Sequence, residues 1–149
     1  MTTITSTLVM EHAAFCAVFD QIEIVLAKLQ SVREVQLFAS LVEGLLKGHG
    51  ETETQLAYAA LDHVLEENGS LKHLHQDHQE IDEHFRRVHN ASELADAQRL
   101  LKKALSATRE HFRREEKTVF PFLERVLQPE TLGALGQTWM QARSLAAPT

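Results

Sequence analysis

The sequence has few of the residues that interrupt helices or cross-link chains. In 149 residues there are one cysteine, three prolines and six glycines. The single cysteine, Cys16, excludes an internal disulfide and is typical of a reducing compartment. Because proline and glycine are so sparse, long helices with few breaks are expected along most of the chain.

Long apolar runs and an excess of positive charge are also absent. No apolar run approaches the length of a membrane span, and the start, MTTITSTLVMEH, lacks the basic segment and apolar core of a signal peptide. The formal net charge is -6, the wrong sign for attracting the phosphates of DNA or RNA. We therefore expect a soluble cytoplasmic protein, a monomer or a homodimer, with no nucleic-acid or membrane partner.

Helical periodicity runs through nearly the whole sequence and predicts one all-α domain over residues 1–149. Four long helices are expected to form an up-down-up-down four-helix bundle over about residues 8–127. The second of them is expected to carry Leu45 on its inner face, and the fourth to kink at Pro121. A short C-terminal helix over about residues 130–145 is expected to cover one end of the bundle or a dimer contact. We find no internal repeat.

The nine histidines separate into classes when they are placed on helices at about 100° per residue. Four lie on the apolar stripes of successive helices: His12, His49, His78 and His111. Two glutamates, Glu53 and Glu115, each follow one of these histidines by four residues and so share its face. His73 and His84 point away from the stripe. His63 and His89 face inward but lie about 20 Å and 16 Å along their helices from His49 and His78.

The six inward residues are predicted to form a metal site. An isolated inward histidine is usually a hydrogen-bonded core residue, but here four fall at similar levels of the bundle. Burying two carboxylates beside them without a cation costs several kcal/mol each. Carboxylates and histidines on facing bundle helices are how this architecture builds dinuclear sites, in which glutamates bridge the two cations.

The pattern resembles the hemerythrin-like, or HHE cation-binding, family. The matching segments are EH at 11–12, HGETE at 49–53, DHQEID at 77–82 and HFRREEKTVFPFLE at 111–124. The resemblance implies a four-helix bundle with two non-haem iron ions, with or without a bridging oxo or hydroxo group; zinc and manganese are alternatives. It also implies a set of metal ligands, namely His12, His49, Glu53, His78, His111 and Glu115.

Two departures separate the chain from the oxygen-carrying members of that family. Those proteins have HxxxH on the third helix, where this chain has Leu74 four residues before His78. They also use an aspartate five residues after the last histidine, where this chain has Glu116, and Glu115 faces inward better. Reversible oxygen carriage therefore does not follow from the resemblance.

Four further residues have two interpretations each. His75 is either a replacement ligand or a solvated side chain, and Asp82 is a ligand, a hydrogen-bond acceptor for an imidazole, or neither. Tyr58 either donates to a bridging oxygen or packs in the core. Cys16 either reaches the edge of the site or is a small buried side chain.

The function favoured by these residues is that of a di-iron protein that binds or reacts with dioxygen, peroxide or nitric oxide in a sensing or protective role. The alternative is an iron-storage or structural metal-binding protein without small-molecule chemistry. A third hypothesis is an interaction protein that binds a partner through its C-terminal helix. Whether there is catalytic turnover stays open.

Overall fold

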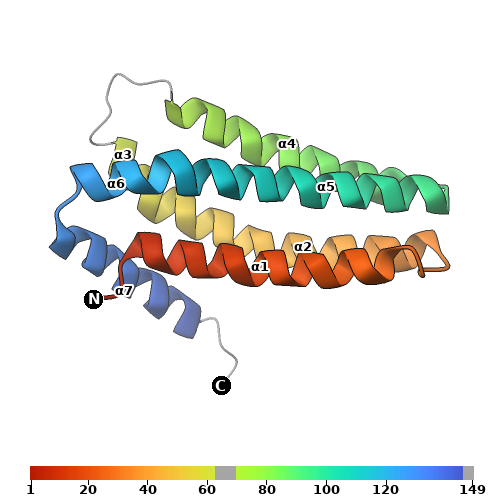
Figure 1. Cartoon of the computed structure of the whole chain (residues 1–149), viewed down its shortest axis with the longest axis horizontal. Coiled ribbons are helices and arrows are strands. Elements are labelled where there is room, and N and C mark those ends of the chain that lie inside the picture. The colour runs from red at the N-terminus through yellow and green to blue at the C-terminus, as the bar shows by residue number, and fades with distance from the viewer. Residues whose placement is uncertain (63–69, 146–149) are drawn as a thin grey trace.

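Four long helices form the body of the protein. The computed structural model describes residues 1–62 and 70–145, and almost all of this range is helical. The long helices are α1 (Ile4–Leu26), α2 (Val32–Glu53), α4 (Ser70–Asn90) and α5 (Leu94–Arg114), and they run alternately in opposite directions (Figure 1). The predicted all-α bundle is confirmed.

Hydrogen-bonded caps fix where the first two helices begin. The Thr3 side chain accepts from the backbone N–H of Ser6, and the Ser31 side chain accepts from that of Glu34; in both, the second residue bonds back to the cap. Such reciprocal boxes satisfy backbone donors that a helix start otherwise leaves free. These boxes fix Thr3 and Ser31 as the residues directly before α1 and α2.

Two of the long helices continue through a wider π-helical turn. After α2 come η1 (Thr54–Tyr58) and α3 (Ala59–Asp62), and after α5 come η2 (Glu115–Val119) and α6 (Phe120–Val126). The kink expected at Pro121 stays a prediction; the irregularity near it is this π turn, which begins at Glu115. Pro121 has no N–H to offer the preceding turn. Within η2, the hydroxyl of Thr118 donates to the carbonyl of Arg114 at 2.6 Å. Such π turns are frequent at functional sites.

The C-terminal helix α7 (Pro129–Leu145) packs against α1 (Figure 1). Gly136 allows this close approach, because a Cβ atom at that position would lie 2.6 Å from the carbonyl oxygen of Thr2. Leu132 is buried in the same contact region. The helix therefore covers one side of the bundle near its N-terminal end.

The interior consists of two apolar clusters with a polar layer between them. One cluster includes Phe19, Phe85 and Leu101, and the other includes Leu8 and Leu123. Along every long helix, the inward histidines fall between the residues of these two clusters. Packing on both sides therefore holds the polar layer at a fixed depth in the bundle.

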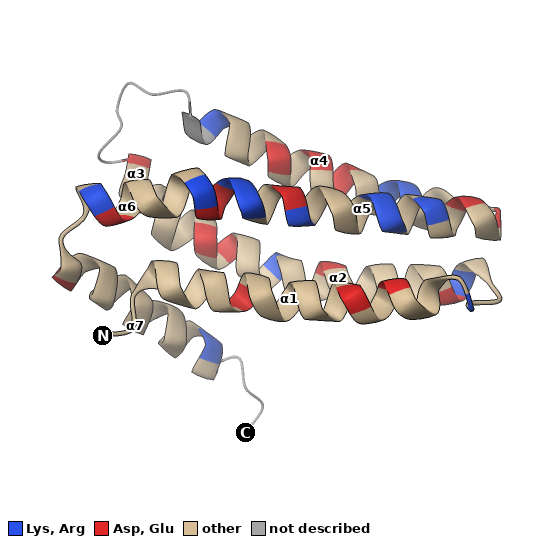
Figure 2. Ribbon diagram, in the orientation of Figure 1, with Lys and Arg blue, Asp and Glu red and all other residues tan. Residues whose placement is uncertain are grey.

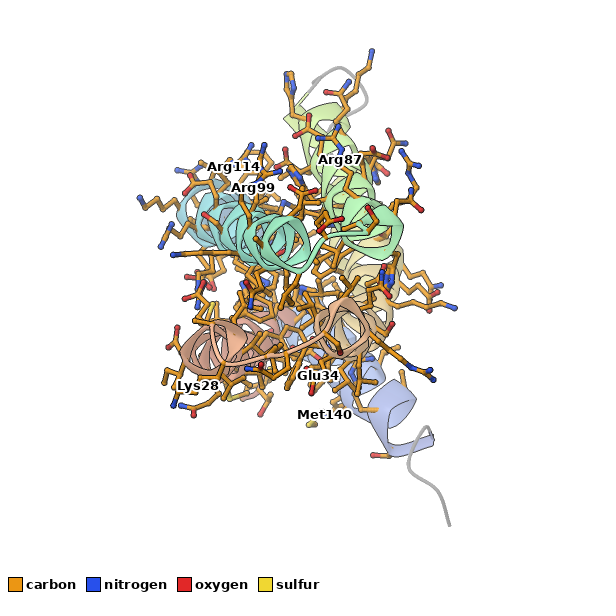
Figure 3. The ribbon with its side chains drawn as sticks, turned by 90° about the vertical axis from the view of Figure 1, so that its right-hand side faces the viewer. Lys28, Glu34, Arg87, Arg99, Arg114 and Met140 are labelled. Atoms are coloured by element: carbon orange, nitrogen blue, oxygen red, sulfur yellow. The ribbon has the colours of Figure 1, made fainter. Side chains whose placement is uncertain are left out.

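The outer surface carries charges of both signs. Figure 2 shows that α5 and its continuation bear many of them, whereas long stretches of α1 and α7 bear none. In Figure 3, a view along the bundle, labelled side chains such as Arg87 and Arg99 lie at its periphery. Leu45, predicted to face inward, is 42% exposed, because α2 turns the neighbouring Leu46 toward the core. Within residues 1–62 and 70–145, no helix combines the length and apolar character that crossing a membrane requires.

Candidate metal centre

The six predicted residues meet in the polar layer and form two groups. His12 and His49 lie with Glu53 and Glu115 in one group, and His78 and His111 lie with the same two glutamates in the other. Within each group, one ligand atom from every residue lies within 4.8 Å of the others. The register of α4 thus brings His78 to the level of the other three histidines.

Both glutamates lie between the two groups. One carboxylate oxygen of Glu115 is 3.4 Å from Nε2 of His12, and the other is 3.1 Å from Nε2 of His111. Oε2 of Glu53 is 3.8 Å from Nε2 of His49 and 3.5 Å from Nε2 of His78. Each glutamate is the residue from which a π turn starts, so the wider turn follows directly after the side chain that points into the centre.

The two glutamates are fully buried and incompletely satisfied. Both have 0% exposed surface, and both oxygens of Glu53 and Oε2 of Glu115 have no hydrogen-bond partner among the described residues. Unpaired carboxylate oxygens at this depth are costly unless a cation or a proton compensates them. The donor set of imidazole nitrogens and carboxylate oxygens suits a transition-metal cation.

Carboxylates behind three of the histidines fix the direction of the rings. Nδ1 of His12 lies 2.9 Å from Glu116, that of His49 lies 2.7 Å from Glu11, and that of His111 lies 3.1 Å from Asp77. An imidazole that donates its Nδ1–H outward presents the lone pair of Nε2 to the centre, which is the form that binds a metal.

Two arginines hold these outer carboxylates in place. Arg143 of α7 bonds Oε1 of Glu11 through Nε at 3.0 Å and Nη2 at 2.7 Å, while the other oxygen of Glu11 faces His49. Arg114 bonds Asp77 at 3.0 Å in the same manner behind His111. The C-terminal helix therefore contacts the centre through one intervening side chain.

Tyr58 is both a core residue and a hydrogen-bond donor to the centre. Its side chain is fully buried, and its hydroxyl donates to Glu115. Burial and the charge of Glu53 raise the pKa of Tyr58, so the hydroxyl keeps its proton. Tyr58 therefore packs in the core, and donation to a bridging oxygen stays a prediction.

The protonation of the metal-free centre follows from burial and from these contacts. Burial and the neighbouring His49 lower the pKa of His12 to about 3, and burial and His111 lower that of His78 to about 4. Burial and the charge of Glu115 raise the pKa of Glu53 well above its ordinary value. Burial would also raise the pKa of Glu115, but the bond from His111 outweighs it and holds it at about 2. A buried carboxyl that keeps a proton in this way is poised to exchange it for a cation.

An open pocket of about 600 Å³ reaches the centre from the surface between α2 and α4. The imidazoles of His49, His78 and His111 form part of its lining. The side chain of His78 is 25% exposed, whereas those of His12, His49 and His111 are almost fully buried. The centre is therefore accessible from one side, next to His78.

Several candidates from the sequence do not join the centre. His75 packs edge-on against Tyr58, Asp82 is exposed at the pocket, and Cys16 is half-buried beside the larger apolar cluster. Leu74 is buried in the other cluster. Among the remaining histidines, His73 is exposed and His84 is half-buried, both away from the metal groups.

His89 was predicted to face inward and does not. It lies near the end of α4, is exposed, and pairs with Glu43 at 2.6 Å. Near the end of a helix a long polar side chain reaches water easily, so the helical phase alone does not bury it. His63 lies outside the described residues.

The centre is built from two halves with the same order of residues. The first half uses Glu11, His12, His49, Glu53 and Tyr58, and the second uses Asp77, His78, His111, Glu115 and Phe120. In each half the acidic residue before the first histidine faces Nδ1 of the second histidine. The aromatic residue of each half stacks on the first histidine of the other, with ring centres 5.7 Å apart for Tyr58 and His78 and 5.6 Å apart for Phe120 and His12. The sequence thus contains one pattern twice: an acidic residue followed by a histidine, and then a second histidine followed by a glutamate and an aromatic residue. The expectation of no internal repeat is wrong in this respect.

The outer residues Glu11, Asp77, Glu116, Arg143 and Arg114 were not predicted. The three carboxylates each reach an imidazole on a neighbouring helix, and the two arginines bond two of those carboxylates. The only signal in the sequence is the acidic residue directly before an inward histidine, in EH at 11–12 and DH at 77–78.

Comparison with family models gives a match over residues 3–133 to the hemerythrin HHE cation-binding domain. Comparison with curated proteins gives no match, and neither does comparison with solved structures. The matched range includes all six residues of the two metal groups and ends within α7, before Arg143.

Proposed function

Because the chain belongs to the hemerythrin HHE cation-binding family, we propose that it holds two iron ions and binds or reacts with dioxygen, peroxide or nitric oxide in a sensing or protective role. The ligands in this proposal are the four inward histidines and the two central glutamates. The whole chain acts as one domain, with α7 as its outer support.

The observation that carries the proposal is the sharing of Glu53 and Glu115 by two groups that each add their own pair of histidines. Glu115 directs one oxygen toward a histidine of each group, and Oε2 of Glu53 lies near a histidine of each, so both carboxylates are suited to bridge two cations. The buried, unpaired oxygens of Glu53 are the atoms that such cations would satisfy. A single ion would leave two of the imidazoles without a function.

Several side chains around the centre have separate roles in this proposal. Glu116, Glu11 and Asp77 fix the rings of three histidines, so the nitrogen atoms already face the centre before a cation arrives. The hydroxyl of Tyr58 donates its hydrogen to Glu115, which keeps a proton within reach of the centre. The pocket admits a small molecule beside His78. Iron supplies the redox chemistry and the open coordination positions that such molecules need.

Elemental analysis of protein purified without chelators tests the proposal. We expect two iron ions per chain and absorption of visible light by the oxidised protein. A reproducible value of one ion per chain would refute the dinuclear centre. Two zinc ions in a colourless protein that does not respond to dioxygen, peroxide or nitric oxide would instead establish the alternative, a structural or storage site.

A further inference from the structure

The pocket beside His78 is larger than a diatomic molecule or hydrogen peroxide requires. A water molecule takes about 30 Å³ in the liquid, and drug-sized ligands occupy pockets of about 300–1,000 Å³. The volume of about 600 Å³ falls in the second range. Along α4 the lining extends from His78 to Phe85, which corresponds to about 10 Å.

The lining changes in character with distance from the imidazoles. Beyond them, Leu46, Ile81, Phe85 and Phe112 supply apolar surface, and Ile81, Phe85 and Phe112 belong to the buried core. If a ligand bound with its apolar part along this surface, that part would be removed from contact with water, which is favourable. A polar head on that body would lie next to the imidazoles.

Charged residues surround this apolar surface. Glu43, Glu51 and Asp82 contribute carboxylates, and Lys47 contributes the single ammonium among the lining residues. Nearby negative charge penalises an anion that loses water on binding. The lining residues by themselves therefore favour an uncharged molecule over a carboxylate of the same size.

From these features we propose that the pocket binds an uncharged organic molecule with one polar head, of the class of organic hydroperoxides. The head points to His78, and the apolar body lies along Ile81 and Phe85. This inference rests on the proposed function and specifies its substrate class. Reduction of a hydroperoxide breaks the O–O bond with two electrons and two protons and yields an alcohol and water. Two ferrous ions held by the four histidines and two glutamates would supply the electrons, each becoming ferric, and water that enters the open pocket would supply the protons.

Binding is tested first, without any reaction. The zinc-loaded protein, labelled at isoleucine and leucine methyl groups, is titrated with 2-phenyl-2-propanol, the alcohol that corresponds to cumene hydroperoxide. We expect saturable NMR shifts at Ile81 and Leu46 and none at Leu123, which is buried in the other apolar cluster. In the metal-free protein, benzoate, of similar size but negative, should bind at least tenfold more weakly than the alcohol. Absence of saturable shifts at Ile81 and Leu46 would overturn the proposal.

Two neighbouring leucines provide a matched pair of variants. Leu46→Trp fills the pocket and should weaken binding of the alcohol at least tenfold, whereas Leu45→Trp, on an exposed position in another groove, should not. If circular dichroism shows that Leu46→Trp does not fold, the smaller change Leu46→Phe takes its place. Asp82→Lys should strengthen benzoate binding, because it replaces one of the three carboxylates by an ammonium. Equal alcohol binding in the Leu46 and Leu45 variants would contradict the assignment.

The reaction test separates this proposal from the proposed function. Ferrous protein is mixed with hydrogen peroxide or with cumene hydroperoxide, and its oxidation is followed by absorbance. We expect both to react, with Leu46→Trp lowering the rate for cumene hydroperoxide at least tenfold relative to hydrogen peroxide. Reaction with hydrogen peroxide alone would overturn the inference and leave the proposed function standing. If neither peroxide, dioxygen nor nitric oxide has any effect, the proposed function fails, and the NMR titration still decides whether the pocket binds the alcohol.

Discussion

Arg143 lies beyond residue 133, where the family match ends, yet it supports a histidine of the metal centre. Its two bonds to Glu11 leave the second oxygen of that carboxylate directed at Nδ1 of His49. Arg143→Gln removes both bonds and the positive charge. Glu11, which is only 15% exposed, is then free to turn toward water and away from the imidazole.

The expected size of the effect follows from this geometry. Loss of a carboxylate bonded directly to a metal-binding histidine typically costs about 10–100-fold in metal affinity. Arg143 acts through Glu11, so we expect the lower end, about tenfold or about 1.4 kcal/mol, for the position served by His12 and His49. Glu11→Ala should cost more. Arg143→Lys keeps the charge but cannot bond the carboxylate through two parallel N–H groups, and should lie between wild type and Arg143→Gln.

A competition titration against a coloured chelator, resolving two binding steps, measures this effect. Arg143→Gln should weaken one step and leave the other close to wild type. Arg114→Gln is the matched change behind Asp77 and His111 and should weaken the other step. The loss should be smaller, because Arg114 makes only one bond to its carboxylate, among the described residues. If Arg143→Gln alters neither step, the link from α7 to the centre has no effect on metal binding. If both variants weaken the same step, the two arginines do not serve separate metal positions. Unchanged helical content by circular dichroism excludes loss of fold as the cause.

Three further predictions concern the centre itself. Glu53→Ala should abolish or greatly weaken metal binding, whereas Glu51→Ala, exposed two residues away, should not; equal loss by elemental analysis would mean that the phase of α2 is misassigned. In the metal-free protein the pKa of Glu53 is raised, so above pH 4.5 the folded state retains a proton that the unfolded chain releases, and stability falls by up to about 1.4 kcal/mol per pH unit. Metal-free Glu53→Gln should therefore lose less stability than wild type between about pH 5 and about pH 7 in urea unfolding, and an equal loss would contradict the raised pKa. The ferrous protein should oxidise in air and not carry oxygen reversibly, because apolar Leu74 stands where the carriers have a histidine; a full, long-lived and reversible oxygen spectrum in stopped-flow mixing would refute this.

The inner part of the centre could be predicted because it depends on helical spacing alone. His49 with Glu53, and His111 with Glu115, are separated by one α-helical turn, and each pair precedes or begins the π segment. The regular phase of about 100° per residue therefore holds up to each glutamate. The shared level of the four histidines followed from loop positions, because antiparallel neighbours in a bundle start and end together.

The rest of the site depends on properties that helical phase does not contain. Glu11 and Asp77 lie beside the stripe, and only the neighbouring helix shows that their carboxylates meet an imidazole. Arg143 depends on how α7 packs, which is set by a close contact at Gly136 and not by a repeating pattern. No proline accompanies the π turn after Glu53, so the sequence gives no sign of it. The phase of α2 was misjudged at Leu45 because two adjacent leucines satisfy the same apolar pattern.

The sharing of the two glutamates has a mechanical consequence. His12, His49 and Glu53 come from the hairpin formed by α1 and α2. His78, His111 and Glu115 come from the hairpin formed by α4 and by α5 with its continuation η2. Each position takes both of its histidines from one hairpin and one glutamate from the other. A cation at either position would thus link the two hairpins. Its removal would weaken the contact between them while leaving each hairpin intact.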